Sequence, residues 1–406
     1  MTDRGQASQA SARRPPFALF ILMAVIPSFS TNVFVPSMPG LVAYFQSTPV
    51  TVQLTLTLYL LTLGVGQLLL GPLSDRFGRR PVLLTGLGVY VLGTILCLTA
   101  GAVESLIAAR VIQAAGGCAG LVLGRAMIRD LYARDKAAGV LGYVTMTMAM
   151  ATGLAPFIGA FLEEWWGWRA SFVLMTALGS LLVLGALRFA RETVTSRSAM
   201  PSPAHMVAVH GSVLGAAGFR RFGGYSVCIL GSYYAFMAGA PYVVIVLFGQ
   251  PPSQFGVYYI FAGAAYITGN FLAGRLSERL GAETMTKVGG TIAALSGLAL
   301  IALAMMDIRH PLAIFLPISV SFIGSGLSQP SAMMSAIDAV PRNIGAAAGL
   351  LGALQLGVGA IASLAVGATQ GASPLPFAAI SGGFLLLALA ILVGGRAPRL
   401  GRKPGG

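Results

Sequence analysis

Long stretches of this chain carry no charged side chain. No Asp, Glu, Lys or Arg occurs in residues 15–74, 222–274 or 343–395, and each of these runs is 53 to 60 residues long. A helix needs about 20 apolar residues to cross the roughly 30 Å hydrocarbon core of a bilayer. Each run therefore predicts two membrane-spanning helices joined by a turn.

Six shorter apolar runs are each long enough for one further span: 81–103, 105–128, 137–162, 170–187, 288–306 and 310–337. These runs are apolar on all sides, whereas the strands of a membrane barrel alternate apolar and polar residues. The pattern predicts an all-α integral membrane protein with twelve transmembrane helices.

Composition and charge placement support this interpretation. The chain is 56% hydrophobic and only 9% charged, which excludes a soluble globular protein. The net charge of +14 could suggest a nucleic-acid partner, but the positions of the basic residues relative to the predicted helices give another explanation. Of the 26 Lys and Arg, 23 fall on one side of the predicted helices, and only Arg169 and Arg309 fall on the other. This positive-inside bias predicts cytoplasmic termini and no nucleic-acid partner.

An internal repeat divides the twelve predicted spans into two sets of six. Residues 71–78 read GPLSDRFG, and 203 residues later 274–281 read GRLSERLG, each after the second helix of its half. Two parallel repeats predict a binding site between them near the membrane midplane. The expected parts are an N-terminal cytoplasmic tail (1–16), a six-helix bundle (17–190), a central cytoplasmic loop (191–221), a second six-helix bundle (222–395) and a C-terminal cytoplasmic tail (396–406).

Three motifs carry a resemblance to a known family. The segment GPLSDRFGRR at 71–80 resembles the loop motif of the major facilitator superfamily. The segment RVIQAAG at 110–116 resembles its helix 4 arginine motif, and GLAPFIGA at 153–160 resembles the helix 5 motif of drug exporters. Finer matches at 125–132, 166–172 and 239–242 resemble the bicyclomycin/chloramphenicol-resistance branch. The resemblance implies a monomeric exporter of small amphipathic compounds in the bacterial inner membrane, driven by protons.

The resemblance also assigns a role to the loop motif. By position, Asp75, Arg79 and Asp130 form an ion-pair cluster that holds one conformation shut, on a loop framed by Gly71 and Gly78. Helix dipoles and charge-assisted hydrogen bonds favour such a latch. The alternative is a solvated turn whose ion pairs contribute little.

The helix 5 motif implies a gate. Pro156 removes one backbone hydrogen bond from its helix, and Gly153 and Gly159 let a partner helix approach closely. We expect this helix to bend there and to seal one route to the site. A proline kink without any role in gating is the alternative.

Arg110 is the most informative single residue because an arginine inside a span costs at least ~2.5–3.5 kcal/mol and therefore faces a cavity or a partner. Gln113 follows at i+3 and shares its face. Snorkelling to the outer headgroups is the alternative. The remaining candidates for substrate binding are polar, aromatic or methionine residues at helical spacing that also suit plain helix packing: Asn32, Tyr59, Tyr234, Met237, Tyr266 and Gln355.

The proton pathway departs from the family pattern. Many members of the branch carry an aspartate in helix 1, where this chain has Asn32, which cannot titrate. All twelve acidic residues can be placed outside the membrane. An edge acid such as Glu104 or Asp75 then carries the proton, or the substrate does, or transport is downhill. A dipolar or anionic substrate group that pairs with Arg110 is a further possibility.

Enzyme chemistry is not expected, because the sequence contains no metal-ligand spacing, nucleotide-binding loop or nucleophile–base pair. No cofactor or metal is implied. The sequence therefore predicts an alternating-access exporter of drug-like molecules. Its expected partners are the small-molecule substrate, protons that drive transport, and the lipid bilayer in which it lies. The alternative is a facilitator or importer of a small metabolite.

Overall fold

The computed structural model describes residues 15–194 and 199–395, and these form helices joined by short turns, with no strand among them. The predicted tails lie outside the described residues, except for Pro15 and Pro16. The helices of the first half are α2 (Phe17–Asn32), η1 (Val35–Ser37), α3 (Met38–Tyr44), α4 (Pro49–Phe77), α5 (Arg79–Leu98), α6 (Val103–Leu131), α7 (Arg134–Trp166) and α8 (Arg169–Phe189). Those of the second half are α9 (Pro203–Gly215), η2 (Phe219–Gly223), α10 (Gly224–Pro241), η3 (Tyr242–Leu247), α11 (Pro252–Leu280), α12 (Ala282–Met305), α13 (Leu312–Asp338), η4 (Pro341–Asn343), α14 (Ile344–Thr369) and α15 (Leu375–Gly394).

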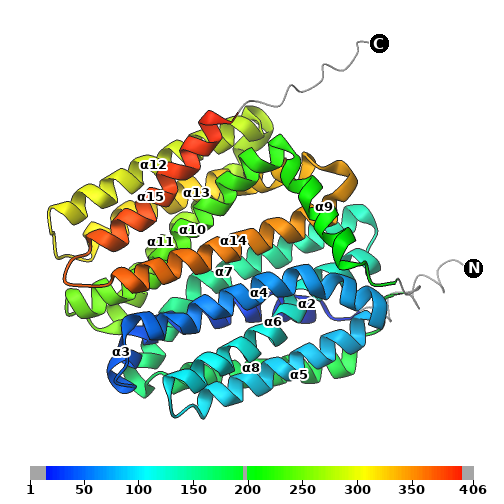
Figure 1. Ribbon diagram of the computed structural model, residues 1–406, viewed down its shortest axis with the longest axis horizontal. Helices are drawn as coiled ribbons and strands as arrows, with labels where there is room; N and C mark the ends of the chain where they lie inside the picture. The colour runs from blue at the N-terminus through cyan, green and yellow to red at the C-terminus, as the bar shows by residue number, and fades with distance from the viewer. Residues whose placement is uncertain (1–14, 195–198, 396–406) are drawn as a thin grey trace, which may run out of the picture. The chain divides into compact units, whose positions relative to one another are not determined.

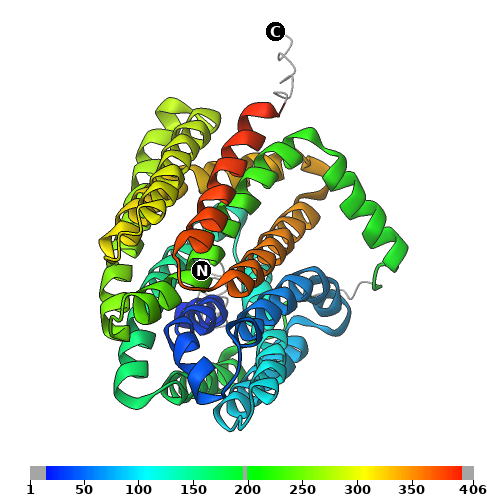
Figure 2. The same ribbon diagram turned by 60° about the vertical axis from the view of Figure 1, so that its left-hand side comes forward.

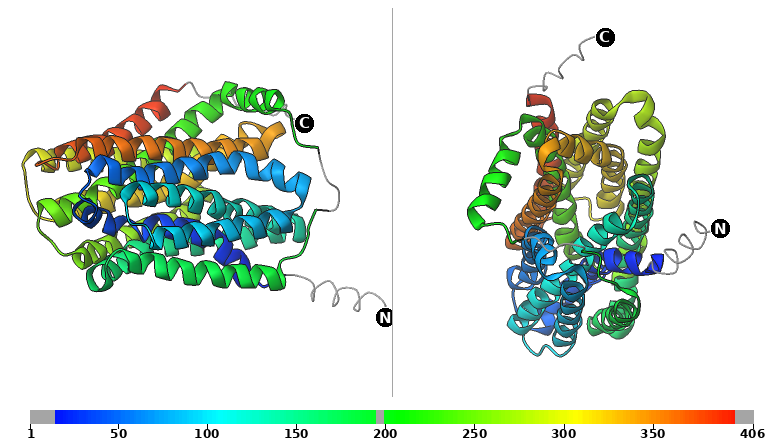
Figure 3. Two further views of the ribbon diagram at one scale, coloured as in Figure 1. Left: turned by 60° about the horizontal axis from the view of Figure 1, so that its bottom comes forward. Right: turned by 90° about the vertical axis from the view of Figure 1, so that its right-hand side faces the viewer.

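Eleven stretches among the described residues are long and apolar enough to cross a membrane. The remaining long helix is α11, which has 29 residues and is less apolar because it contains Gln254, Asn270 and several tyrosines. The predicted all-α fold with twelve long helices is confirmed. The central loop contains one further helix, α9, which packs on α14 (Figures 1 and 3).

The first span is broken near its C-terminal end. Its helix α2 ends at Asn32, a short 3₁₀ turn follows at Val35–Ser37, and α3 completes the span. Pro36 has no N–H to donate to the carbonyl of Asn32, so the α-helical hydrogen-bond ladder stops there. The break leaves backbone carbonyls available to neighbouring helices.

Packing divides the chain into two compact units. The first unit contains the residues up to Pro201 together with Val244–Ile260, and the second contains Ser202–Val243 and the residues from Phe261 onward. Residues 244–260 group with the first unit, although the sequence places them in the second bundle. They do so because Gly256 packs on α7, where an added Cβ would lie 2.8 Å from Cβ of Ala160.

The two units repeat the same packing. In the first, α5 lies against α6 and α8, and α2 lies against α7 (Figure 1). In the second, α12 lies against α13 and α15, and α10 lies against α14 (Figure 2). Glycines allow close helix contacts in both: an added Cβ on Gly116 would overlap the carbonyl oxygen of Gly86, and one on Gly289 would overlap that of Gly324. These pairs occupy equivalent helices, which supports two pseudo-repeats.

Candidate functional site

Arg110 lies in the interior of the first unit. Its side chain on α6 has no exposed surface, so it does not snorkel. Nη1 donates to the carbonyl oxygen of Ser30 at 3.3 Å and to Oε1 of Gln113 at 2.6 Å. Arg110 and Gln113 therefore lie together, as their spacing predicts. Ser30 is available as an acceptor because it lies just before the break in the first span.

Two aromatic rings flank the guanidinium. Its Cζ lies 4.0 Å from the ring centroid of Tyr59 and 4.7 Å from that of Phe34. The Tyr59 hydroxyl donates to the carbonyl oxygen of Pro27 at 3.1 Å, which holds the ring in place. Cation–π contacts stabilise a desolvated charge by about 2 kcal/mol. The two rings therefore offset part of the cost of burying this arginine.

Part of the guanidinium lacks a polar partner. Nε and Nη2 of Arg110 are buried without a hydrogen-bond acceptor in the described part of the chain. No described carboxylate forms an ion pair with it either. Buried polar groups normally have partners, and an unpaired one is costly. These two nitrogens are therefore available to donate to water or to a polar group of a ligand.

A second layer of hydrogen bonds fixes the Arg110 cluster. The amide of Gln113 donates to Oγ1 of Thr94 at 2.9 Å. The hydroxyls of Ser30 and Tyr90 are hydrogen-bonded to each other at 2.7 Å. All four side chains are buried and come from α2, α5 and α6. The geometry around the guanidinium is thus set by three helices.

Asn32 and Tyr266 are held by neighbours in their own units. Asn32 is buried in the last turn of α2, and its Nδ2 donates to the carbonyl oxygen of Ser28 at 2.7 Å. Tyr266 on α11 is half-buried, with its ring centroid 6.3 Å from that of Phe322.

The other candidates of the second unit lie on α10 and α14. Gln355 donates through Nε2 to Oγ of Ser226 at 2.8 Å. The ring of Tyr234 fills the space that a Cβ on Gly359 would occupy, and Met237 is fully buried. Packing therefore accounts for Tyr234 and Met237 in this structure, whereas Gln355 belongs to a buried polar cluster.

The loop motif brings its predicted charges together. Nη1 of Arg79, the first residue of α5, lies 2.6 Å from Oδ1 of Asp75, and its Nε lies 3.2 Å from Oδ2 of Asp130. Arg79 also donates to Oγ of Ser74. Arg79 therefore connects the ends of α4 and α6. Gly71 lies in open space, so close packing does not explain it.

Gly78 and Glu192 complete this corner. Gly78 joins α4 to α5 with φ of +102°, a conformation that favours glycine, and an added Cβ would overlap the Glu192 carboxylate. Glu192 Oε1 accepts from the backbone N–H of Arg79 at 2.8 Å, and Oε2 accepts from that of Arg80 at 3.3 Å. Glu192 thus caps the N-terminus of α5, where the helix dipole favours an anion.

The charge state of Glu192 follows from these contacts. Partial burial raises the pKa of its carboxylate, but four backbone N–H groups, those of Val194, Arg79, Arg80 and Thr193, lower the pKa further than burial raises it. The pKa therefore lies below its ordinary value, and the ionised form stabilises the fold.

We expect Glu192→Ala to lower thermal stability by about 1 kcal/mol, as loss of a helix cap does. The stabilisation by Glu192 is complete above its unfolded pKa of about 4.3, and it is lost as the pH falls through the lower pKa of the folded state. Melting curves of the purified protein at several pH values measure this. The wild type and the variant should differ at neutral pH and converge in acid. Glu278→Ala, which changes an exposed acid without an ion pair, is the control.

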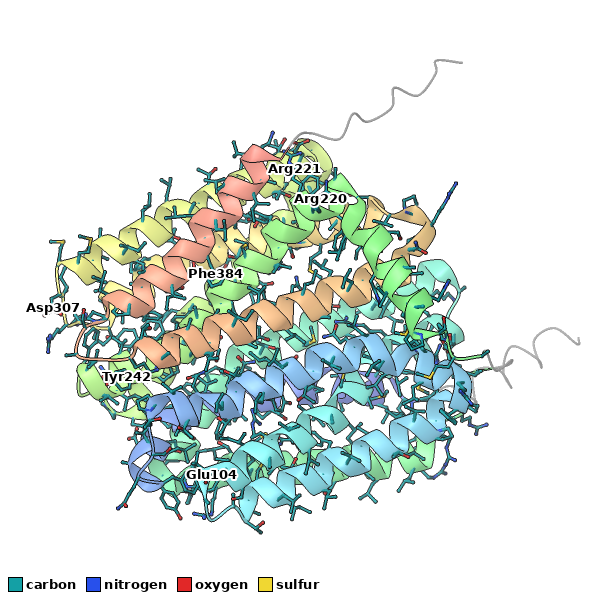
Figure 4. The ribbon with its side chains drawn as sticks, in the orientation of Figure 1. Glu104, Arg220, Arg221, Tyr242, Asp307 and Phe384 are labelled. Atoms are coloured by element: carbon teal, nitrogen blue, oxygen red, sulfur yellow. The ribbon has the colours of Figure 1, made fainter. Side chains whose placement is uncertain are left out.

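The second copy of the motif keeps the turn and loses the cluster. Gly281 has φ of +78° and begins α12 as Gly78 begins α5. Ala282 occupies the place of Arg79, and Glu278 and Arg279 are exposed without ion pairs in the described residues. Arg221 instead bridges Oε1 of Glu283 at 2.9 Å and the carbonyl oxygen of Leu392 at 2.8 Å, near the end of α15 (Figure 4).

The helix 5 motif packs on the broken first span. Pro156 and Gly159 are buried in α7, and Gly153 is half-buried. An added Cβ on Gly159 would overlap the carbonyl oxygen of Val33, one residue past the end of α2. The motif therefore allows α7 to touch the first span exactly where its helix is interrupted.

Comparison with known proteins decides the family. Residues 20–363 match the Major Facilitator Superfamily. The chain belongs to the Major Facilitator Superfamily. It is 29% identical to the bicyclomycin resistance protein homolog of Haemophilus influenzae, over 84% of this chain and 85% of that protein. It is 34% identical to a chloramphenicol resistance protein of Pseudomonas aeruginosa, over 65% of this chain and 62% of that protein. The xylose transporter XylE of E. coli has the same fold, with a TM-score of 0.76 and 14% identity over 95% of this chain and 98% of that one.

Membership confirms the family predicted from the motifs and makes this chain a multi-pass small-molecule transporter of the superfamily. Among the described residues, no group of three or more His, Cys, Asp or Glu is placed to hold a metal ion.

Several site residues escaped the sequence analysis: Ser30, Phe34, Tyr90, Thr94 and Glu192. Most are ordinary helix residues whose contacts come from helices far apart in the chain. Ser30 serves Arg110 through a backbone carbonyl, which every residue offers. The sequence does offer one signal near this part of the first span, namely Pro36 and Pro39, because proline interrupts the hydrogen bonds of an α-helix.

Proposed function

We propose that this transporter exports small amphipathic drug-like molecules across the bacterial inner membrane by alternating access, with protons moving inward. The observation that carries the proposal is buried Arg110, whose Nε and Nη2 have no hydrogen-bond partner among the described residues and whose guanidinium lies over the rings of Tyr59 and Phe34. Such a site suits a flat molecule with a polar substituent, because the rings contribute apolar area and the guanidinium orients a dipole. The drug-resistance proteins among its relatives support the same class of substrate.

Chloramphenicol is the probe that tests this function. Cells without their major drug pumps are grown with and without this chain, and chloramphenicol accumulation is followed before and after a protonophore. We expect the chain to lower accumulation and the protonophore to abolish the difference. Higher accumulation would instead identify an importer, and a decrease that the protonophore leaves unchanged would separate export from proton coupling.

The membrane topology proposed here has both termini in the cytoplasm and a single chain as the working unit. The placement of 23 of the 26 basic residues on one side of the membrane supports this orientation. The ion-pair cluster of Arg79 then lies on the cytoplasmic side, and the contact of Gly256 with α7 lies on the outer side.

We further propose that Arg79, Asp75 and Asp130 act as a latch on the cytoplasmic side. The Arg79 side chain is only 12% exposed and holds two carboxylates from different helices. Its removal would leave those like charges close together, so the arrangement that the cluster stabilises should become less populated.

We expect Arg79→Ala to slow chloramphenicol export several-fold while the protein still folds. Export from preloaded cells, corrected for the amount of protein in the membrane, measures the effect. Arg279→Ala is the matched control, because Arg279 lies in the second copy of the motif and is exposed without an ion pair. Equal rates for the two variants would remove the latch from the mechanism.

The helix 5 motif supports the gating part of the proposal. Gly159 allows contact with the broken first span, and one residue further along α7, Ala160 meets Gly256. Both contacts would have to change for the outer side to open. In this proposal Gly153, Pro156 and Gly159 therefore form the part of α7 that moves when the gate opens or closes.

A further inference from the structure

One carboxylate of the first unit differs from all the others that the structure describes. Glu163 lies near the outer end of α7, and its Oε2 is buried without a hydrogen-bond partner. Its Oε1 lies 3.1 Å from where a Cβ on Gly40 would stand, so the side chain reaches the outer part of the first span. The hydroxyl of Ser37, which is also buried, faces this carboxylate.

The other described carboxylates are satisfied or exposed. Asp75 and Asp130 pair with Arg79, Glu283 pairs with Arg221, and Asp307 pairs with Arg309. Glu192 accepts backbone N–H groups, and Glu164 accepts from the backbone N–H of Ser253 at 2.9 Å. The remaining three, whose side chains are open to water, are Glu104, Glu278 and Asp338.

No positively charged side chain that the structure describes forms an ion pair with Glu163. At the Glu163 end of α7, the neighbouring elements carry Glu104 and Arg110 on α6, Arg169 on α8, and the tyrosines of α3 and of residues 244–260. The other charged residues of α6 and α8, which lie toward the opposite ends of these helices, are Arg125, Arg129, Asp130 and Arg188. Arg110 is engaged with Ser30, Gln113 and the two rings, and Arg169 donates to the carbonyls at the end of α5 and to Tyr44. Glu104 lies in the exposed first turn of α6 (Figure 4). None forms an ion pair with Glu163 in the described chain.

We propose that Glu163 is the proton-carrying carboxyl group of this transporter, in place of a titratable residue at Asn32. Glu163 is half-buried, with Oε2 removed from water. An ionised carboxylate in such a position without an opposite charge is costly, so Glu163 holds a proton while it lies against Ser37 and Gly40. Loss of the proton favours separation of the outer part of the first span from α7, because water then solvates the charge. One O–H bond forms with a proton from outside and breaks when the proton leaves toward the cytoplasm.

The break in the first span connects this proton site to the drug site. Arg110 contacts one side of the break through the carbonyl of Ser30 and the ring of Phe34. Glu163 contacts the other side at Ser37 and Gly40. Binding of a drug to Arg110 and loss of a proton from Glu163 would therefore both affect the broken part of the first span. This gives a physical route for the coupling that antiport requires.

This inference rests on the proposed export function, and reconstitution in liposomes separates the two. Wild type, Glu163→Gln and Glu164→Gln are each tested with chloramphenicol, first for accumulation driven by an imposed pH gradient and then for exchange without a gradient. Glu164 is the matched control because it is the adjacent carboxylate and is exposed. We expect Glu163→Gln to keep exchange and lose gradient-driven accumulation, whereas Glu164→Gln behaves as the wild type.

Each other outcome overturns a defined statement. Absence of gradient-driven transport in the wild type would overturn the export function and this inference with it. Gradient-driven accumulation by Glu163→Gln equal to that of the wild type would overturn the proton role of Glu163 alone. Loss of both exchange and accumulation in Glu163→Gln would assign the residue to folding or binding instead.

The pH dependence of chloramphenicol binding provides a second readout. Because binding is measured at equilibrium, it can be compared even between variants that transport slowly. Wild type and Glu163→Asp, which retain a carboxyl group, should bind chloramphenicol more tightly as the pH rises, because proton loss accompanies drug binding. Glu163→Gln cannot gain or lose a proton at this position, so its binding should be independent of pH. A pH dependence in Glu163→Gln that matches the wild type would place the proton elsewhere.

Discussion

Arg110→Lys is expected to abolish useful chloramphenicol export, with binding weakened about tenfold or more. A hydrogen bond from a charged donor contributes about 1.5–3 kcal/mol, and each 1.4 kcal/mol is a factor of ten in affinity. A lysine ammonium is a compact charge without the planar fork of arginine, so it cannot serve Ser30, Gln113 and a ligand together while lying flat between two rings. Binding to purified protein and export from cells both measure the loss.

The matched control for Arg110 is Arg275→Lys. Arg275 also lies over an aromatic ring, with its Cζ 4.4 Å from the ring centroid of Phe271, but its side chain is exposed. We expect this variant to bind and export as the wild type does. Retention of export by Arg110→Lys at wild-type affinity would mean that the buried guanidinium is a packing element and not part of the substrate site.

Gly159→Ala is expected to cause the largest loss of stability of any single methyl addition to α7. The new Cβ would overlap a backbone carbonyl, that of Val33, which cannot turn aside as a flexible side chain does. Overpacking of this kind costs about 1–3 kcal/mol and sometimes more. The contact between α7 and the broken first span would open, so both the melting temperature and chloramphenicol export should fall.

Gly142→Ala in the same helix is the control for Gly159. Gly142 has no atom within 4 Å of an added Cβ, so alanine should be tolerated there and stabilise the helix by about 0.5–1 kcal/mol. Thermal unfolding of the detergent-purified variants gives the comparison. If the two variants melt at the same temperature and export equally, the proposed role of Gly159 at the first-span contact is wrong.

Glu163 and Glu192 show where sequence reasoning ends. Both are ordinary glutamates near the ends of predicted spans, and both fit a solvated position equally well. The structure separates them, because Glu192 meets four backbone N–H groups and Glu163 meets none. The decisive neighbours lie far away in the sequence: Arg79 and Arg80 are more than 100 residues from Glu192, and Gly40 is more than 100 residues from Glu163.

The amino-acid sequence by itself determined the twelve long helices, their division into two halves and the family. Those features depend on local apolar length, on the placement of charge, and on short motifs such as residues 71–80, all of which are written along the chain. The association of Arg79 with Asp75 and Asp130 was also predictable, since the motif states it. Gly78 marked its turn for the same local reason, because only glycine adopts that backbone conformation readily.

Only the tertiary structure decided what surrounds Arg110, which acid lacks a partner and where α7 meets the first span. Each of these depends on side chains and backbone carbonyls brought together from helices distant in sequence, and a uniformly apolar helix gives no periodic signal for the face that meets a given neighbour. Burial and hydrogen bonding, which set the properties of Arg110 and Glu163, are consequences of that packing.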